Sequence, residues 1–212
     1  MGILYKCKKY FNQSTLLMLY NVFVYPYYNY CVTISGNTCK TYIDPLLKLQ
    51  KRAVRIIRNV PFRTHTAPLF NELNILTLCK LHVYAVQLLM YKHKHSELPD
   101  IFSSFFVPNS MIHNYFTRQH DCLHVPLIHG NLAGRNLRSF GVKTFNYFNS
   151  RIGMLCSYAA YKRRLKLYLL NNDWIGFSFG PCTVVTRPWR YPWMLWFFMS
   201  RLSCFPLRVY LH

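Results

Sequence analysis

The stretch LLKLQKRAVRIIRNVPFRTHTAPLF, residues 46–70, carries six lysine or arginine side chains and no acidic residue. Its apolar residues recur at steps of three and four, which is the spacing of one face of an α-helix. The basic residues recur at similar steps on the other face. We therefore predict a helix from about residue 41 to just before Pro61, with its apolar face packed on the preceding helix and its basic face in water.

The basic side of this helix is the candidate binding site. A solvated helix face is the ordinary explanation for such a row, but the whole chain has 26 Lys plus Arg against 6 Asp plus Glu, a formal net charge of +20. So large an excess favours a polyanionic partner, either nucleic acid or an anionic membrane surface. The predicted nucleic-acid-binding residues are Lys48, Lys51, Arg52, Arg55, Arg58 and Arg63.

Helical patterns also occupy the neighbouring segments, so we predict a mainly α fold. The segment 14–34 starts at Ser14, a favourable N-cap, and is interrupted by Pro26. A short helix, a turn at Asn74 and a longer amphipathic helix over residues 77–93 follow the basic stretch. From about residue 107 to 135 prolines and glycines predict an irregular, loop-rich segment, with short strands as an option at 122–128.

The last periodic segment covers residues 157–172 and is predicted to be an amphipathic helix with Lys162, Arg163, Arg164 and Lys166 pointing outward. Beyond it periodicity is lost, and we predict that the tail 173–212 is irregular, disordered or poorly packed. The longest apolar run there, residues 193–199, is far shorter than the ~20 residues that span a bilayer. Arginines flank this run, so an interfacial segment stays open as an alternative.

No catalytic or metal-binding pattern is visible. The six carboxylates are scattered, whereas two-metal chemistry needs clustered ones. No two of the eight cysteines are closer than eight positions, which excludes zinc-knuckle spacings. We predict no catalytic residue, no metal site and no cofactor. A Cys–His nucleophile stays open, although no spacing indicates a pair. The thiols and the absence of a secretory signal indicate an intracellular protein, nuclear or cytoplasmic and not secreted.

A series of short motifs resembles the region that follows the catalytic core in reverse transcriptases of non-LTR retrotransposons, of the jockey and CR1-like kind. LYNVFVYPYYNYCVTISG (19–36) is similar to the helix that leads into that region. LQKRAVRII (49–57), HTAPLFNELNILTL (65–78), LP-x2-F (98–102), HNYFTR (113–118) and G-x3-FN (141–146) follow in the order and at the spacings of the family. The resemblance covers about residues 1–170.

The chain also departs from the family pattern. Ser35-Gly36 stands where the family usually has Trp-Gly, and Phe145-Asn146 stands where it usually has Trp-Asn. The polymerase motif with its aspartate pair, the fingers, the palm and the endonuclease domain are missing. We therefore expect a C-terminal fragment of such an element, in which Met1 replaces an upstream residue of a truncated or decayed copy.

The resemblance implies a division into a thumb-like helical bundle at 1–62, a post-thumb helical region with a loop-rich middle at 63–172, and the tail at 173–212. A thumb grips the primer–template duplex, so the implied partner of the basic face is the backbone of RNA or of an RNA–DNA hybrid. The missing palm and fingers portion of an intact element enzyme is a second implied partner. The chain itself is expected to be no enzyme.

Two other functions stay open at this stage. The chain could be a basic protein associated with membrane surfaces, without a transmembrane segment, or a decayed reading frame without selected function. Stacking of bases on the tyrosine cluster at residues 25–30, and RNA contacts from His113, Tyr115 and Arg118, are further options, but core packing and loop-fixing hydrogen bonds are favoured for these residues.

Overall fold

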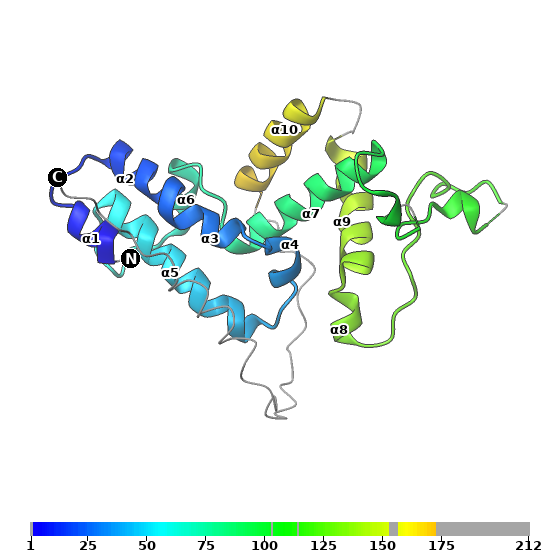
Figure 1. Ribbon diagram of the computed structural model, residues 1–212, viewed down its shortest axis with the longest axis horizontal. Coiled ribbons are helices and arrows are strands. Elements are labelled where there is room, and N and C mark those ends of the chain that lie inside the picture. Colours follow the sequence, from blue (N-terminus) through cyan, green and yellow to red (C-terminus); the bar gives the residue numbers. More distant parts are fainter. Residues whose placement is uncertain (1, 103, 114, 153–156, 173–212) are drawn as a thin grey trace, which may run out of the picture. The chain divides into compact units, whose positions relative to one another are not determined.

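The computed structural model describes residues 2–102, 104–113, 115–152 and 157–172, and the predicted tail 173–212 lies outside them. The described chain is mainly helical, as predicted (Figure 1). Its elements follow in the order α1 (Gly2–Cys7), α2 (Gln13–Leu19), η1 (Tyr20–Val24), α3 (Tyr25–Asn29), α4 (Val32–Ser35), α5 (Lys40–Arg58), α6 (Ala67–Glu72), α7 (Leu78–Lys94), η2 (Asp100–Phe102), η3 (Asn109–Met111), α8 (Asn131–Gly134), α9 (Leu137–Ile152) and α10 (Tyr158–Asn171).

The helical segment predicted over residues 14–34 forms as α2, η1 and α3 up to Asn29, and α4 follows after a break at Cys31, where φ is 50°. α2 passes into the π-helical turn η1, which is closed by a hydrogen bond from the Tyr25 amide to the Tyr20 carbonyl. α3 then starts with Pro26 in its first turn. Proline removes one donor from the helical hydrogen-bond ladder, and the wide turn directly before it absorbs this break.

The start of α2 corrects the predicted cap. Asn12, not Ser14, is the N-cap residue. Asn12 Oδ1 accepts hydrogen bonds from the Thr15 amide at 3.0 Å, from the Ser14 hydroxyl at 2.9 Å and from the Thr15 hydroxyl at 2.7 Å. One carboxamide oxygen thus satisfies an otherwise unpaired amide of the first turn together with two neighbouring hydroxyls, so the helix begins earlier than expected.

The two long helices predicted around the basic stretch and after Asn74 both form. α5 ends at Asn59, which adopts the left-handed conformation with φ 55°. Asn74 takes the same conformation in the turn after α6, and Thr77 precedes α7 in extended conformation. Asparagine tolerates positive φ better than most residues, so both turns follow directly from the sequence.

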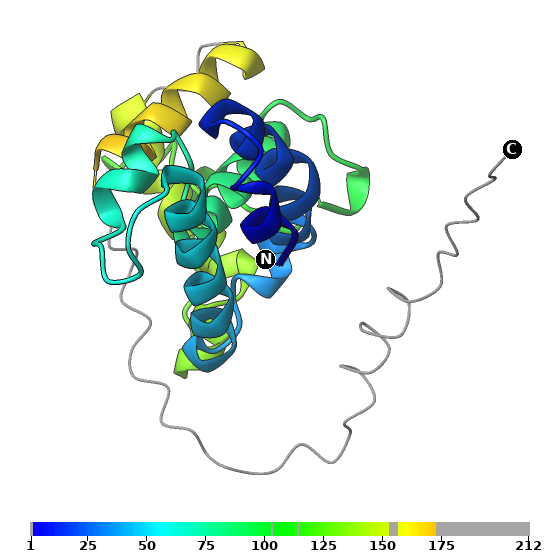
Figure 2. The same cartoon turned by 90° about the vertical axis from the view of Figure 1, so that its left-hand side faces the viewer.

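α7 is the centre of the described fold. It packs against α4, α5, α9 and α10, and Figures 1 and 2 both show α10, in gold, beside it. It is more enclosed than the predicted amphipathic helix, because its buried residues lie around much of its circumference. These residues are Leu78, Leu81, His82, Val83, Tyr84, Val86, Gln87, Met90 and Tyr91.

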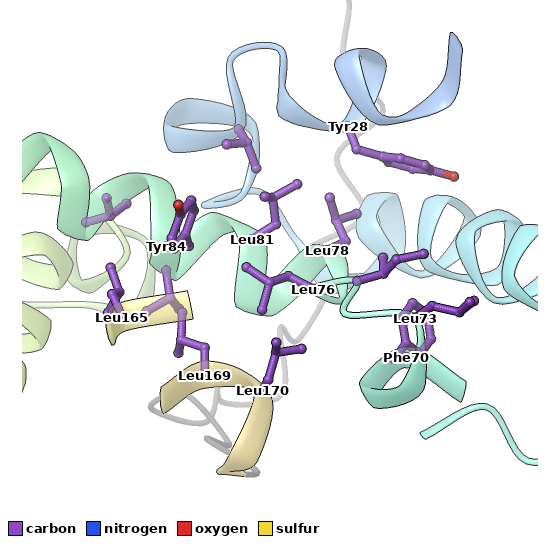
Figure 3. Close-up of a cluster of buried hydrophobic side chains, with 14 of the residues drawn as sticks. Tyr28, Phe70, Leu73, Leu76, Leu78, Leu81, Tyr84, Leu165, Leu169 and Leu170 are labelled. Carbon is purple, nitrogen blue, oxygen red and sulfur yellow. The ribbon is translucent and has the colours of Figure 1, made fainter. Parts of the chain in front are cut away.

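The hydrophobic core draws on both the segment 1–62 and the segment 63–172. Figure 3 shows Tyr28 of α3 on one side of α7 and the leucines of α10 on the other. Leu165 and Leu169 of α10 are fully buried there. Burial of such side chains stabilises a fold by about 1.5–3 kcal/mol each, so α10 contributes a large share of the packing on that side.

A buried glutamine connects α5 to the start of α7. The Gln50 Nε2 donates to the Leu76 carbonyl at 2.9 Å and to the Tyr20 hydroxyl at 3.3 Å. The Gln50 Oε1 accepts from the Leu78 amide at 2.9 Å, which is one of the amides that a helix leaves unpaired in its first turn. Gln50 therefore caps α7 from inside the core and also engages the π-helical turn.

A close approach of α4 to α7 requires a glycine. A Cβ at Gly36 would overlap the ring of His82, so only glycine fits at the end of α4. His82 is 3% exposed, stacks on Phe140 with ring centroids 5.1 Å apart, and bonds to the backbone of Thr33. Burial lowers the pKa of His82 to about 4, so the ring is neutral at physiological pH.

The loop-rich middle is pinned by one side chain of α9. Asn146 accepts from the Leu123 amide at 3.1 Å and donates to the Leu123 carbonyl at 2.9 Å. Among the described residues, the strand option at 122–128 reduces to a single bridge between Leu123 and Pro108. A strand would need a partner for its whole ladder, whereas here an asparagine side chain takes the place of the neighbouring strand.

Replacing Gln50 with alanine should lower the free energy of unfolding by about 3 kcal/mol, because the Leu78 amide and the Leu76 carbonyl would both be left buried without a partner. Urea denaturation followed by circular dichroism measures the change. Gln119→Ala is the matched control, since that side chain is exposed, and it should shift stability by less than about 0.5 kcal/mol. Equal effects of the two substitutions would contradict the role of Gln50.

Because His82 is buried as a neutral ring, we expect the folded chain to lose stability in mild acid. Its pKa is lower in the folded chain than in the unfolded one, so the unfolded chain binds more protons between about pH 6.5 and pH 4. The stabilisation is complete above pH 6.5, falls as pH decreases towards 4, and amounts to about 3 kcal/mol in total. Urea denaturation across this range should show a steeper fall for the wild type than for His82→Leu; parallel curves would refute the assignment.

Candidate nucleic-acid interface

The candidate interface is one side of α5, a helix of 19 residues. Its other side enters the core through Gln50, Ala53, Val54, Ile56 and Ile57, all buried. α5 packs there against α1, α2, α6 and α7. Because these contacts hold one side of the helix, the residues on the opposite side must face away from the core, and they include the predicted basic row.

Three cations of the row are available to a ligand. Lys48 and Arg52 are exposed and Lys51 is half-buried. No hydrogen bond or ion pair joins any of them to another residue in the described ranges. Spacings of three and four residues bring these side chains to one side of two successive helical turns, where their charges reinforce one another. Arg63, in the turn beyond the helix, is exposed and equally uncompensated there.

Arg55 shapes the turn that follows α5. Its Nε donates to the Thr64 carbonyl at 3.0 Å, and its guanidinium lies over the Phe62 ring, 5.4 Å from the centroid. The Thr64 amide in turn donates to the Pro61 carbonyl at 3.1 Å. These contacts hold residues 61–64 against Arg55, so the turn that carries Arg63 is attached to the last turns of α5.

Arg58, the last predicted residue on the helix, is engaged in the fold. Its Nη2 lies 2.6 Å from Glu72 Oε2, and its Nη1 donates to Gln13 Oε1 at 3.0 Å. The arginine thus links α5 to α6 and α2. Glu72 compensates its charge, so Arg58 contributes less to an anion-binding surface than the sequence pattern suggests. The sequence could not reveal this, because Gln13 is 45 positions away.

One carboxylate lies near the basic row. Asp44, one helical turn before Lys48, is half-buried. Burial raises the pKa of the Cys79 thiol at the start of α7, Asp44 raises it further, and Lys40 and Lys51 oppose this. A thiol with a raised pKa is a poor nucleophile, so Cys79 is a poor candidate for the Cys–His chemistry that the sequence left open without naming a pair.

The structure separates the tyrosines of the cluster at 25–30. Tyr28 is buried and donates to the Leu46 carbonyl at 3.3 Å, whereas Tyr27 and Tyr30 are about two thirds exposed. In the loop, the rings of His113 and His124 meet edge to face, and Tyr115 is exposed. Tyr28 therefore helps to hold α5 in place, and its burial is the core packing that the sequence favoured at this residue.

A second basic surface lies on α10. The predicted outward residues are all exposed: Lys162, Arg163, Arg164 and Lys166. The helix begins at Ser157, whose hydroxyl accepts from the Ala160 amide at 3.5 Å. Within the described residues, α10 has no neighbouring turn like residues 61–64 of α5, where an arginine lies over an exposed aromatic ring.

Across the described ranges, no group of three or more His, Cys, Asp or Glu side chains is arranged to hold a metal ion. None of the helices in that part of the chain combines the length and the apolar character required to cross a bilayer. A scan against models of known protein families finds no match, and searches of curated proteins and of solved structures find no significant similarity.

The two kinds of cation on α5 should respond differently to the same substitution. Arg58→Met removes the partner of Glu72 and Gln13 and should lower the free energy of unfolding by about 1 kcal/mol. Arg52→Met, on the same helix but without these contacts, should change it by less than about 0.5 kcal/mol. Thermal and urea unfolding of both variants measures the difference in stability. A larger loss of stability in Arg52→Met than in Arg58→Met would show that Arg58 is not the cation that the fold depends on.

Proposed function

We propose that the chain is a non-catalytic nucleic-acid-binding module that holds the phosphate backbone of RNA or of an RNA–DNA hybrid along α5. The observation that carries the proposal is the arrangement of Lys48, Lys51 and Arg52. They share the solvent side of a helix whose other side is held in the core, and none of them forms a hydrogen bond or an ion pair within the described ranges.

Phosphate contacts of this kind give affinity without sequence specificity. Each phosphate that a cation neutralises releases counterions from the nucleic acid, so binding weakens as salt increases. Contacts to phosphate position a duplex but do not read its bases. With about five such contacts, the dissociation constant would be on the order of 10⁻⁴ to 10⁻⁶ M at physiological salt. The large positive charge of the whole chain would also accelerate encounter with a polyanion.

The resemblance to the region after the catalytic core of non-LTR reverse transcriptases supports the same function. In that family the corresponding helices grip the primer–template duplex, which is the use that we propose for α5. We therefore propose a binding fragment that works inside the cell, in the nucleus or cytoplasm. The palm and fingers portion of an intact element enzyme is its proposed protein partner.

Association with an anionic membrane surface is the second candidate. It is favoured by exposed apolar side chains on the N-terminal helices, among them Met18, Val22 and Phe23. No acidic residue precedes Asp44, whereas four lysines do. An apolar, aromatic-rich surface without acids suits an anionic lipid interface. This candidate uses α1–α3 rather than the basic row of α5, so the two functions can be tested separately.

A variant with glutamine at positions 48, 51 and 52 in place of Lys48, Lys51 and Arg52 should bind the hybrid with a weaker salt dependence. The slope of the logarithm of the association constant K against the logarithm of the salt concentration should become less negative by about three units, because each lost phosphate contact changes it by about 0.9. Fluorescence anisotropy with an RNA–DNA hybrid at several salt concentrations measures the slope.

The matched control removes the same charge from α10, with Lys162→Gln, Arg163→Gln and Lys166→Gln in one variant, and should leave the slope close to the wild type. If the two triple variants behave alike, binding follows net charge and not the α5 face. Vesicles of anionic lipid, offered in parallel, report on the second candidate: binding to vesicles without binding to the hybrid would replace the first proposal.

A further inference from the structure

The turn after α5 presents an aromatic ring that the packing of the fold does not use. Phe62 is 75% exposed, although burial of a phenylalanine is normally favourable. The ring is nevertheless held in place. Arg55 covers it at 5.4 Å, and the turn from Pro61 to Thr64 is closed by the Thr64 amide and fixed to the helix by Arg55 Nε.

Two arginines lie close to this ring, Arg55 over its face and Arg63 as the next residue of the chain. Arg63 is exposed and has no partner among the described residues. Arg55 uses only its Nε for a hydrogen bond in that part of the chain, so its two Nη groups remain open to a ligand. An exposed aromatic surface next to guanidinium groups is the combination that proteins use to bind single strands, with stacking for the bases and charge for the phosphates.

We propose that Phe62 is a stacking platform for an unpaired base, and that Arg55 and Arg63 hold the phosphates beside it. This inference rests on the proposed function and narrows its ligand class to single-stranded RNA or a single-stranded stretch next to a hybrid. Bases inside a duplex have both faces covered by their neighbours and cannot stack on a side chain, whereas unpaired bases can.

Arg55, which covers Phe62, lies on α5 three positions after Arg52 and four after Lys51, so the platform adjoins the basic row. In the proposed complex the strand enters at Phe62, and its backbone runs along Arg52, Lys51 and Lys48 towards the start of α5. The row supplies salt-dependent affinity for any backbone, while the ring adds affinity only for a strand with an exposed base. These two contributions can therefore be measured independently.

The experiment compares the full wild-type chain with Phe62→Leu and Phe62→Trp on two probes. One is a short single-stranded RNA that contains 2-aminopurine, whose fluorescence is quenched by stacking, and the other is a blunt RNA–DNA hybrid of the same sequence. Phe62→Leu keeps an apolar side chain without a ring and should weaken binding to the single strand about tenfold. It should also remove the quenching and leave binding to the hybrid unchanged. Phe62→Trp should retain both affinity and quenching.

Phe23→Leu is the matched control, because Phe23 is similarly exposed and no charged residue lies within ten positions of it. It should bind both probes as the wild type does. Both side chains are on the surface, so thermal melts of the three variants should coincide with that of the wild type.

Two results would overturn the platform while leaving the proposed function intact: unchanged binding of the single strand by Phe62→Leu, or an equal loss on both probes. If the wild type binds neither probe in a salt-dependent manner, the proposed function fails and the platform fails with it.

Discussion

The amide of Gln50 is the interaction on which the rest of the structure depends. It satisfies a carbonyl before α7, an amide in the first turn of α7 and the hydroxyl of Tyr20, all inside the core. A buried amide must place both its donor and its acceptor correctly, so it tolerates little rotation of α5 about its axis. The same constraint determines where Lys48, Lys51 and Arg52 point, and the candidate interface is therefore set by a polar group on the opposite side of the helix.

The cations of this chain divide between structural and surface roles according to their neighbours. Arg58 joins three helices, and Arg135, at 6% exposure, is buried with its Nη1 3.7 Å from the sulfur of Cys39. Arg55 combines the two roles, because it shapes a turn with one nitrogen and leaves the others open. The net charge of the chain thus overstates the charge that a ligand would meet, and a function based on phosphate contacts must be assigned residue by residue.

Two of the motifs that carry the resemblance to reverse transcriptases interlock in space. LQKRAVRII supplies Gln50, and HTAPLFNELNILTL supplies Leu76 and Leu78, which Gln50 bonds. Asn146, the last residue of the G-x3-FN motif, anchors the loop at Leu123. These residues therefore have clear structural roles in this chain. Their hydrogen bonds hold the fold together, whichever ligand the basic side of α5 binds.

The local pattern of the sequence determined the helices and their polarity. The steps of three and four residues placed α5, α6, α7 and α10, Pro61 marked the end of α5 and Asn74 marked a turn, because backbone hydrogen bonding and side-chain periodicity act over a few residues. The tertiary structure alone decided the roles of Asn146 and Arg58. Each depends on contacts between segments that lie far apart in the chain, and no local pattern encodes which donor meets which acceptor there. The exposure of Phe62 also became known only from the tertiary structure, although its contact with Arg55 is local.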